Sequence, residues 1–349
     1  MKEKIYDQKT ICELQKNLIF SLSHAAKTTY SLYVAFEMGL FNVIKDNGSV
    51  DVYTLCRLLG ISDRSGQALL SMCASVGLLE CDANAYYNLS ESTRCFLLPE
   101  SEFYLGDLMN LHLLNKDTIF SYDAFKQAVI TGSPQIYEGR DLFAVNAEED
   151  ERTIAFTKAM HAKSTAAGLF WPKVLSLADK ATFLDIGGGS GAHSIQATLH
   201  WPHLKAIVYD MPLVCQIAEQ FIAKNSLGNR ITTQAGNMWT DELPNADVHF
   251  YCDILHDWPI NKLQMLMKKS YDSLPENGHV IIHELLFDDN KSGPLDVSMY
   301  NMSMLMWTQG QQLSQQEVIN LLTAVGFKNI TFAYTGFGHW SIATGTKHY

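Results

Sequence analysis

Residues 182–210 constrain the fold of this chain more than any other segment. An apolar run over 183–186 leads into the glycine-rich sequence 187–191, and an amphipathic stretch follows over 192–199. A second apolar run, 205–209, ends in the acid that closes the segment. Strand, glycine turn, helix, strand and acid in this order predict the nucleotide-binding half of a parallel α/β sheet.

The glycine spacing alone leaves two cofactor classes open. Gly187, Gly189 and Ala192 satisfy the GxGxxG/A pattern of dinucleotide sites. Asp185, however, stands directly before the glycines and places negative charge near the ligand. That charge suits the cationic sulfur of S-adenosylmethionine better than a pyrophosphate. We therefore expect this cofactor, with S-adenosylhomocysteine as its product.

Composition and charge exclude several classes of protein. The 349 residues, 47% hydrophobic and 18% charged, indicate a folded protein of about two domains. Lys and Arg number 26 against 37 Asp and Glu, and the net charge of −11 argues against nucleic acid or an anionic membrane as partner. The seven cysteines contain no C-x-x-C pair, which indicates reduced thiols rather than a zinc site. A polar N-terminus and the lack of a long apolar run favour a cytoplasmic protein.

The N-terminal part, residues 1–100, is expected to be a helical domain. Residues 10–45 show apolar positions at helical spacing, beginning with Ile11 and Leu14, and are apolar enough to suggest burial against a second copy in a homodimer. Caps at Asp51, Gly60 and Ser62, followed by a small hairpin, predict a winged-helix fold over 49–90.

A winged helix raises the alternative of a DNA-binding protein. Residues 1–100 contain nine basic and eleven acidic side chains, and the expected recognition helix offers only Arg64. Such a surface neutralises few phosphates, so an interaction or dimerisation role is favoured over DNA binding.

Residues 101–175 read as a helical connector that contributes to a substrate pocket, and 176–349 as the catalytic domain. Strands are expected near 182–186, 205–209, 231–234, 247–254, 279–285, 330–335 and 340–345. Helices between early strands imply a parallel sheet, whereas the short turn at 336–338 requires an antiparallel hairpin at the end. The fold class is therefore α/β, a Rossmann-like seven-stranded sheet closed by a C-terminal hairpin, which is not the dehydrogenase arrangement.

Binding sites in such sheets lie at the carboxyl ends of the strands. At these ends, Asp210 with Met211 suits the ribose, Asn237 with Met238 suits the adenine, and Asp253 also faces the cofactor site. Together with Asp185, Gly187 and Gly189, these residues form the expected cofactor site.

His256 is the candidate base. It follows the apolar strand that ends at Ile254, two strand ends from the glycine turn. Imidazole titrates near neutrality and can take a proton from a hydroxyl group. Its other nitrogen needs a partner, and Glu284, at the next strand end, is within reach of that role.

The chain resembles the S-adenosylmethionine-dependent small-molecule O-methyltransferases of the plant caffeate type and their bacterial antibiotic-tailoring and hydroxyindole relatives. The resemblance rests on LDIGGGSG (184–191), VYDMP (208–212), AGNMW (235–239), ILHDW (254–258), GSPQIYEGRDLF (132–143), FTKAM (156–160) and AVGFKNI (324–330). It implies a winged-helix dimerisation domain and metal-independent methyl transfer to a hydroxyl of a small aromatic or polyketide-type acceptor. His256 would be the catalytic base and Glu284 a supporting acid.

Three residues depart from the family pattern. Asn237 and Gln312 stand where the family often has acids, and both retain an acceptor oxygen without its charge. Gln312, the third catalytic candidate, would stabilise an imidazolium less than an acid does, which leaves most of that task to Glu284. Cys252 replaces a lysine that some plant members place on the cofactor.

The expected acceptor pocket is apolar, because methionine adapts to flat or irregular ligands. The candidate lining residues are Phe156, Met160, Met299, Met302, Ser303, Trp307, His112 and Lys163. Lys163 stands where plant members often carry a histidine near the substrate.

Other chemistries remain open. Relatives of this family use the bound cofactor for hydroxylation or pericyclic reactions, and an N- or C-methyltransferase would keep the same cofactor site. The histidine pairs 200/203 and 279/283 have no third ligand at fitting spacing in the sequence, so no metal is expected.

Overall fold

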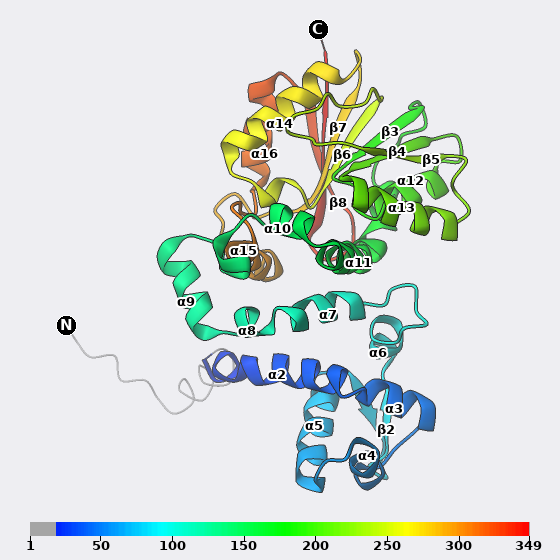
Figure 1. The fold of residues 1–349 in the computed structure, drawn as a ribbon, viewed down its shortest axis with the longest axis vertical. Helices are drawn as coiled ribbons and strands as arrows, with labels where there is room; N and C mark the ends of the chain where they lie inside the picture. Colours follow the sequence, from blue (N-terminus) through cyan, green and yellow to red (C-terminus); the bar gives the residue numbers. More distant parts are fainter. Residues whose placement is uncertain (1–18, 349) are drawn as a thin grey trace, which may run out of the picture. The chain divides into compact units, whose positions relative to one another are not determined.

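The computed structural model describes residues 19–348, in two compact units that comprise residues 1–109 and 110–349 (Figure 1). Helix α7 (Gly106–Leu114) crosses the division between the units. Most of the region expected as a connector therefore belongs to the second unit. The positions Ile11 and Leu14, expected in a first helix, lie outside the described residues.

The first unit consists of short helices and a two-stranded antiparallel wing. Its elements are α2 (Phe20–Glu37), α3 (Leu40–Asn47), α4 (Val52–Leu59), α5 (Asp63–Ser75), β1 (Leu79–Cys81), β2 (Tyr87–Leu89) and α6 (Glu91–Phe96). The predicted caps are confirmed. The Asp51 side chain accepts the Thr54 N–H at 2.7 Å, Gly60 ends α4 with a φ of 67°, and Ser62 caps α5.

One face of α2 exposes large apolar side chains within this unit. Ala35 is its only fully buried position among the described residues, whereas the following side chains are exposed: Ile19, Phe20, Leu22, Tyr30 and Val34. An apolar face of this extent is typical of an interface.

The second unit contains a seven-stranded sheet in the order β5-β4-β3-β6-β7-β9-β8. The strands are β3 (Thr182–Ile186), β4 (Lys205–Asp210), β5 (Ile231–Ala235), β6 (Val248–Cys252), β7 (His279–Leu285), β8 (Lys328–Tyr334) and β9 (Trp340–Thr346). The first five are mutually parallel, and β9 is antiparallel to both β7 and β8. The predicted sheet and its C-terminal hairpin are confirmed.

Helices cover both faces of this sheet (Figure 1). On one face α14 (Ile260–Ser273) and α16 (Gln315–Val325) pack with Leu184 and Ile282. On the other, α12 (Ala192–His200) and α13 (Pro212–Lys224) pack with Phe183 and Ile281. Neighbouring residues of one strand thus enter different cores, which explains why these strands read as continuous apolar runs.

The remaining elements of the unit precede the sheet or connect its strands. They are α8 (Lys116–Ile119), α9 (Tyr122–Thr131), η2 (Ile136–Gly139), α10 (Leu142–Glu148), α11 (Asp150–Gly168), η3 (Trp171–Lys173), η4 (Leu255–Asp257) and α15 (Leu295–Trp307). Among residues 19–348, no helix combines the length and apolarity that crossing a bilayer requires.

The strand order reverses between β3 and β6, which makes their carboxyl ends a topological switch point. The glycine turn follows β3, and the turn η4, which contains His256, follows β6. The fold therefore places both predicted features at the position where ligands bind in open α/β sheets.

Candidate active site

The glycine turn after β3 is tightly packed on one side and open on the other. Gly187 has a φ of 67°, and an added Cβ there would lie 2.5 Å from the Ile254 side chain. Gly189 has a φ of 55°, and an added Cβ would meet nothing within 4 Å. The turn therefore contacts η4 through Ile254 and leaves open space above Gly189.

Asp210 is held against this open space by two backbone N–H groups. Its Oδ2 accepts the Gly189 N–H at 2.8 Å and its Oδ1 accepts the Met211 N–H at 2.7 Å. Burial raises the pKa of Asp210, and these two hydrogen bonds oppose that change. Since a carboxylate has about four acceptor positions, each oxygen can still accept from a diol. The geometry fits the ribose of the expected cofactor.

Asp185 lies beneath the glycine turn. Its Oδ2 accepts the Ser194 hydroxyl at 2.7 Å, and an added Cβ at Gly188 would come within 2.7 Å of its Cγ. Burial raises the pKa of Asp185 to about 7, and the charge of Asp210 adds to this effect although Ser194 opposes it. A cation bound above the turn would favour its charged form.

The residues expected near adenine lie after β5. The Asn237 Oδ1 accepts the Trp239 N–H at 2.9 Å, so this oxygen stabilises its own loop. Asn237 is exposed, and Met238 is half-buried against the core beneath α14. The Asn237 oxygen, expected to face adenine, therefore already accepts a hydrogen bond from a backbone N–H.

His256 and Glu284 form the central contact of the site. His256 is 3% exposed, and its Nδ1 lies 2.6 Å from the Glu284 Oε2. The other carboxylate oxygen of Glu284 accepts the N–H groups of Ile254 at 3.1 Å and Leu255 at 2.9 Å. Glu284 therefore fixes both the imidazole and the turn that carries it. Because Nδ1 faces the carboxylate, it carries the proton in the neutral ring, and Nε2 is the basic nitrogen.

Three acids surround the imidazole. Besides Glu284, Asp253 lies 3.7 Å from Nδ1 and Asp257 lies 3.6 Å from Nε2. Burial by itself lowers the pKa of His256, but Glu284, Asp257 and Asp253 outweigh it and raise that pKa to about 9. Burial also raises the pKa of Asp257 to about 7, although His256 opposes this change.

Lys163, from α11, is occupied by partners within the protein. Its ammonium donates to the Asp253 Oδ2 at 2.7 Å and to the Tyr300 hydroxyl. Burial opposes the charge of Lys163, but Asp253 and Tyr300 hold its pKa above the ordinary value. Asp253, an expected cofactor residue, thus joins Lys163 to the surroundings of His256.

Aromatic rings adjoin the turn that carries His256. Phe143 stacks on Trp258 at 5.3 Å between ring centroids, and Phe156 packs edge-on against Phe143 at 6.1 Å. Phe156, an expected substrate residue, is therefore connected through Phe143 to Trp258, two residues after His256. Met160, one helical turn from Phe156, is half-buried on α11.

The expected residues of α15 differ in exposure. Met299 is 58% exposed, whereas Met302, Ser303 and Trp307 are half-buried. The Ser303 hydroxyl donates to the Met299 carbonyl at 3.4 Å, within its own helix. The Met299 side chain is therefore largely open to solvent.

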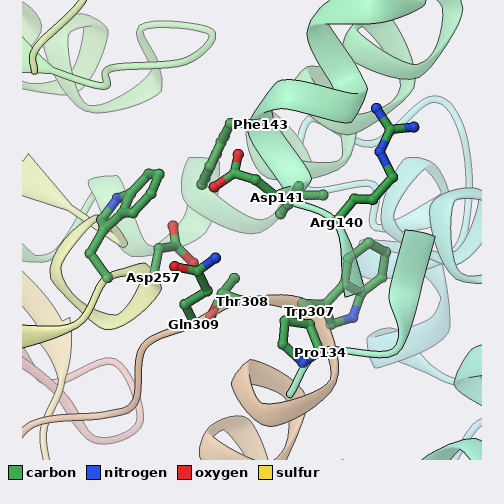
Figure 2. Close-up of a pocket in the computed structure, with 10 residues that line it drawn as sticks. Pro134, Arg140, Asp141, Phe143, Asp257, Trp307, Thr308 and Gln309 are labelled. Carbon is green, nitrogen blue, oxygen red and sulfur yellow. The ribbon is translucent and has the colours of Figure 1, made fainter. Parts of the chain in front are cut away.

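A small pocket lies beside the end of α15 (Figure 2). Figure 2 shows Phe143 and Asp141 on one side, with Asp257 and Gln309 on the other, and Trp307 also contributes to the wall. At about 10 Å³ it has room for roughly one water molecule, so it does not itself hold an aromatic acceptor.

Gln312 and His112 are the remaining expected residues. Gln312 is fully buried, and among the described residues neither side-chain polar atom has a hydrogen-bond partner. The Gln312 backbone N–H donates to the Asn301 Oδ1 at 2.8 Å. Within the described part of the chain, Gln312 makes no hydrogen bond with His256. His112 is half-buried on α7, and burial lowers its pKa to about 4.

Two groups of side chains in the described part of the chain have the composition of metal ligands. One is Asp253, His256 and Glu284, and the other is His193, Cys252 and His283. His283 therefore lies near the possible ligand atoms of Cys252 on β6 and His193 on α12, and this group does not include His279. The sequence spacing gave no sign of either group.

Three residues near these groups were absent from the sequence predictions. Tyr300 lies among the methionines of α15 and packs edge-on to His256 at 5.4 Å. His161 lies one residue after a motif of the resemblance and its Nδ1 is 2.7 Å from the hydroxyl of Ser190 in the glycine turn. Phe143 ends another such motif. For His161 and Phe143, a position in or next to a motif of the resemblance was therefore the available signal.

Comparisons with known proteins agree with this geometry. A family model described as the O-methyltransferase domain matches residues 122–328, and one described as the O-methyltransferase dimerisation domain matches residues 20–99. The chain is 30% identical to a 3-hydroxy-5-methyl-1-naphthoate 3-O-methyltransferase from Streptomyces sahachiroi, over 95% of both chains. It is 27% identical to an L-tyrosine C(3)-methyltransferase from Streptomyces lavendulae, over 89% of this chain and 86% of the relative.

A solved structure shares the fold over the whole chain. The human N-acetylserotonin methyltransferase in complex with S-adenosylmethionine superposes with a TM-score of 0.87, at 24% identity and with 100% of both chains covered.

Gly310 provides a test of how the turn is held. An added Cβ would lie 2.2 Å from the His256 carbonyl oxygen and 2.4 Å from the Trp258 nitrogen, backbone atoms that no rotation can move away. Because overpacking costs about 1–3 kcal/mol, Gly310→Ala should displace the turn and weaken the N–H bonds to Glu284. Hydrogen–deuterium exchange over 254–258 should become faster. Gly228→Ala, which meets nothing within 4 Å, is the control; unchanged exchange in Gly310→Ala would contradict the expectation.

Proposed function

Because the chain belongs to the S-adenosylmethionine-dependent O-methyltransferase family, we propose that it methylates a hydroxyl group of a small aromatic acceptor with His256 as the base. S-adenosylmethionine is the methyl donor, and O-methylation of a small molecule is the reaction class. The observation that supports the finer assignment is the 2.6 Å contact of His256 with Glu284 at the switch point of the sheet.

Asp210, with its two remaining acceptor positions, would hold the ribose of the donor above Gly189. Met211, Asn237 and Met238 would line the adenine. When bound, the donor supplies a methyl group on a cationic sulfur that leaves as a neutral thioether. Asp185 would contribute negative charge beneath the turn, and its buried position keeps water from screening that charge.

His256 would remove the proton of the acceptor hydroxyl with Nε2. A phenol has a pKa of about 10, and the pKa of His256 is raised to about 9. The proton therefore moves between groups of similar basicity, which favours efficient transfer as the oxygen attacks. Positioning of the acceptor between this nitrogen and the methyl group would supply much of the remaining acceleration.

Glu284 would stabilise the imidazolium formed in this step. Its carboxylate is already fixed by two backbone N–H groups, so it needs no rearrangement when the charge develops. Asp257, 3.6 Å from Nε2, would add to this stabilisation. Gln312 offers a neutral acceptor and would contribute less than the acid common in the family.

Several aromatic side chains favour a planar acceptor. Phe143, Phe156 and Trp258 form a continuous aromatic cluster next to the turn that carries His256, and Tyr300 packs edge-on to the imidazole. Met160, Met302 and Trp307 lie on the two helices that contribute to this region. Two similar proteins are named for a hydroxynaphthoate and for N-acetylserotonin, both fused aromatic compounds.

The first unit would form a homodimer. It matches the dimerisation domain of the family, and α2 exposes apolar side chains. Burial of that face against a second copy would remove apolar surface from water.

Substitution of the base is the direct test of the reaction. His256→Ala should reduce kcat roughly 10²- to 10⁴-fold while calorimetry shows that S-adenosylmethionine still binds. The assay uses methyl-labelled donor with a panel of hydroxylated aromatics and identifies the methylated atom. His200→Ala, at an exposed position, is the control. An unchanged rate would exclude His256 as the base, and label on carbon would favour the chemistry named for the tyrosine relative.

The pH profile should report the acids around the imidazole. Only neutral His256 can accept a proton, so kcat/KM should rise with pH and level off near the raised pKa of about 9. Glu284→Gln removes the principal charge that raises this pKa, and the acidic limb should move to lower pH with a lower plateau. Glu276→Gln, at an exposed position before β7, should leave the profile unchanged. A limb that stays in place in Glu284→Gln would contradict the electrostatic role.

The dimer should depend on α2. Leu22 is 61% exposed, and a charge at this position would have to be buried in a dimer interface, so Leu22→Glu should convert dimer to monomer in light scattering. Leu199→Glu, at a position 51% exposed on α12, is the matched control. A wild-type monomer, or equal masses for both variants, would contradict the assignment.

A further inference from the structure

A second polar cluster lies in the catalytic unit and has no role in the proposed reaction. It consists of His193 from the first turn of α12, Cys252 from the end of β6, and His283 from β7. One ligand atom from each residue lies within 4.8 Å of the other two. Cys252 and His283 are also paired in the register of the parallel strands.

The two imidazoles are deeply buried without adequate partners. His193 is 5% exposed and His283 is 0% exposed. Among the described residues, neither ring nitrogen of His193 has a hydrogen-bond partner, and the Nε2 of His283 has none. Because an unpaired buried polar group destabilises a fold, such a cluster is unfavourable unless something binds it.

We propose that His193, Cys252 and His283 form a binding site for Zn²⁺ or a similar borderline-soft divalent ion. A thiolate and two neutral imidazoles are a donor set that such ions prefer, and three protein ligands leave a fourth position open. The Cys252 Sγ lies 3.4 Å from the His283 Nδ1. Sulfur and nitrogen ligands on one tetrahedral zinc ion would be roughly 3.6 Å apart, so this edge of the site is already formed.

The electrostatic surroundings support a cation. Burial raises the pKa of the Cys252 thiol, and the negative charges of Asp253, Glu284 and Asp185, which would favour a bound cation, raise it further, whereas Lys163 opposes them. Lys163 is itself paired with Asp253 at 2.7 Å. Cys252 would bind as a thiolate and release its proton, which makes binding pH-dependent.

An ion at this site would join three elements of the active-site floor. Cys252 precedes Asp253, His283 precedes Glu284, and His193 lies two residues after the glycine turn. Coordination would therefore stiffen β6, β7 and α12 where they support His256 and the cofactor. This site is separate from the metal-independent methyl transfer and does not depend on that assignment.

Cobalt substitution tests the proposal in the full-length protein. After chelation and dialysis, titration with Co²⁺ should give the intense visible bands of a four-coordinate ion and a thiolate-to-cobalt charge-transfer band in the near ultraviolet. One equivalent of Zn²⁺ should abolish both and raise the melting temperature. Cys252→Ser should lose the charge-transfer band, whereas Cys215→Ser, which removes another buried thiol of the same unit, should retain it.

Other variants separate the two clusters. His283→Gln should weaken Co²⁺ binding, and His256→Gln should not, because the Asp253, His256 and Glu284 cluster has no sulfur. Circular dichroism establishes that each variant is folded. Weak octahedral bands without charge transfer, a charge-transfer band that persists in Cys252→Ser, or no retained ion in the folded wild-type protein would each overturn the proposal.

Discussion

The Glu284 carboxylate is the interaction on which the candidate active site depends. It is 2% exposed, and a charge so buried is tolerable only when its hydrogen-bonding capacity is used. Two backbone N–H groups of the turn after β6 and the imidazole of His256 supply those bonds. The same contacts that satisfy the carboxylate therefore define the path of the turn and the orientation of the ring.

That turn is also connected to the cofactor side of the site. Ile254, whose N–H binds Glu284, packs against Gly187 so closely that no side chain fits there. A displacement of the base would therefore disturb the glycine turn, and the reverse also holds. The arrangement relies on close packing and on buried hydrogen bonds rather than on a network of surface charges.

The sequence predicted the architecture well and the side-chain contacts less well. Strands buried on both faces are continuous apolar runs, so β3 and β7 were located at their observed bounds. The adjacency of Glu284 to His256 followed from strand ends, since parallel strands bring their carboxyl ends together. Contacts made by long side chains could not be read in this way. Lys163 was expected to face the substrate, but it binds Asp253 and Tyr300. The His193, Cys252 and His283 cluster joins three elements separated by many residues, and spacing rules detect only ligands that are close in sequence.

The insertion of β9 between β7 and β8 has a consequence for synthesis on the ribosome. The strand that carries Glu284 pairs with residues 340–346, and Glu284 itself is opposite Ser341. Until this late segment has emerged from the exit tunnel, β7 presents an open edge to solvent, and an unpaired edge is a template for association with other chains. Translation of the last strands, rather than of the glycine turn, therefore sets the moment at which this edge of the sheet can be paired.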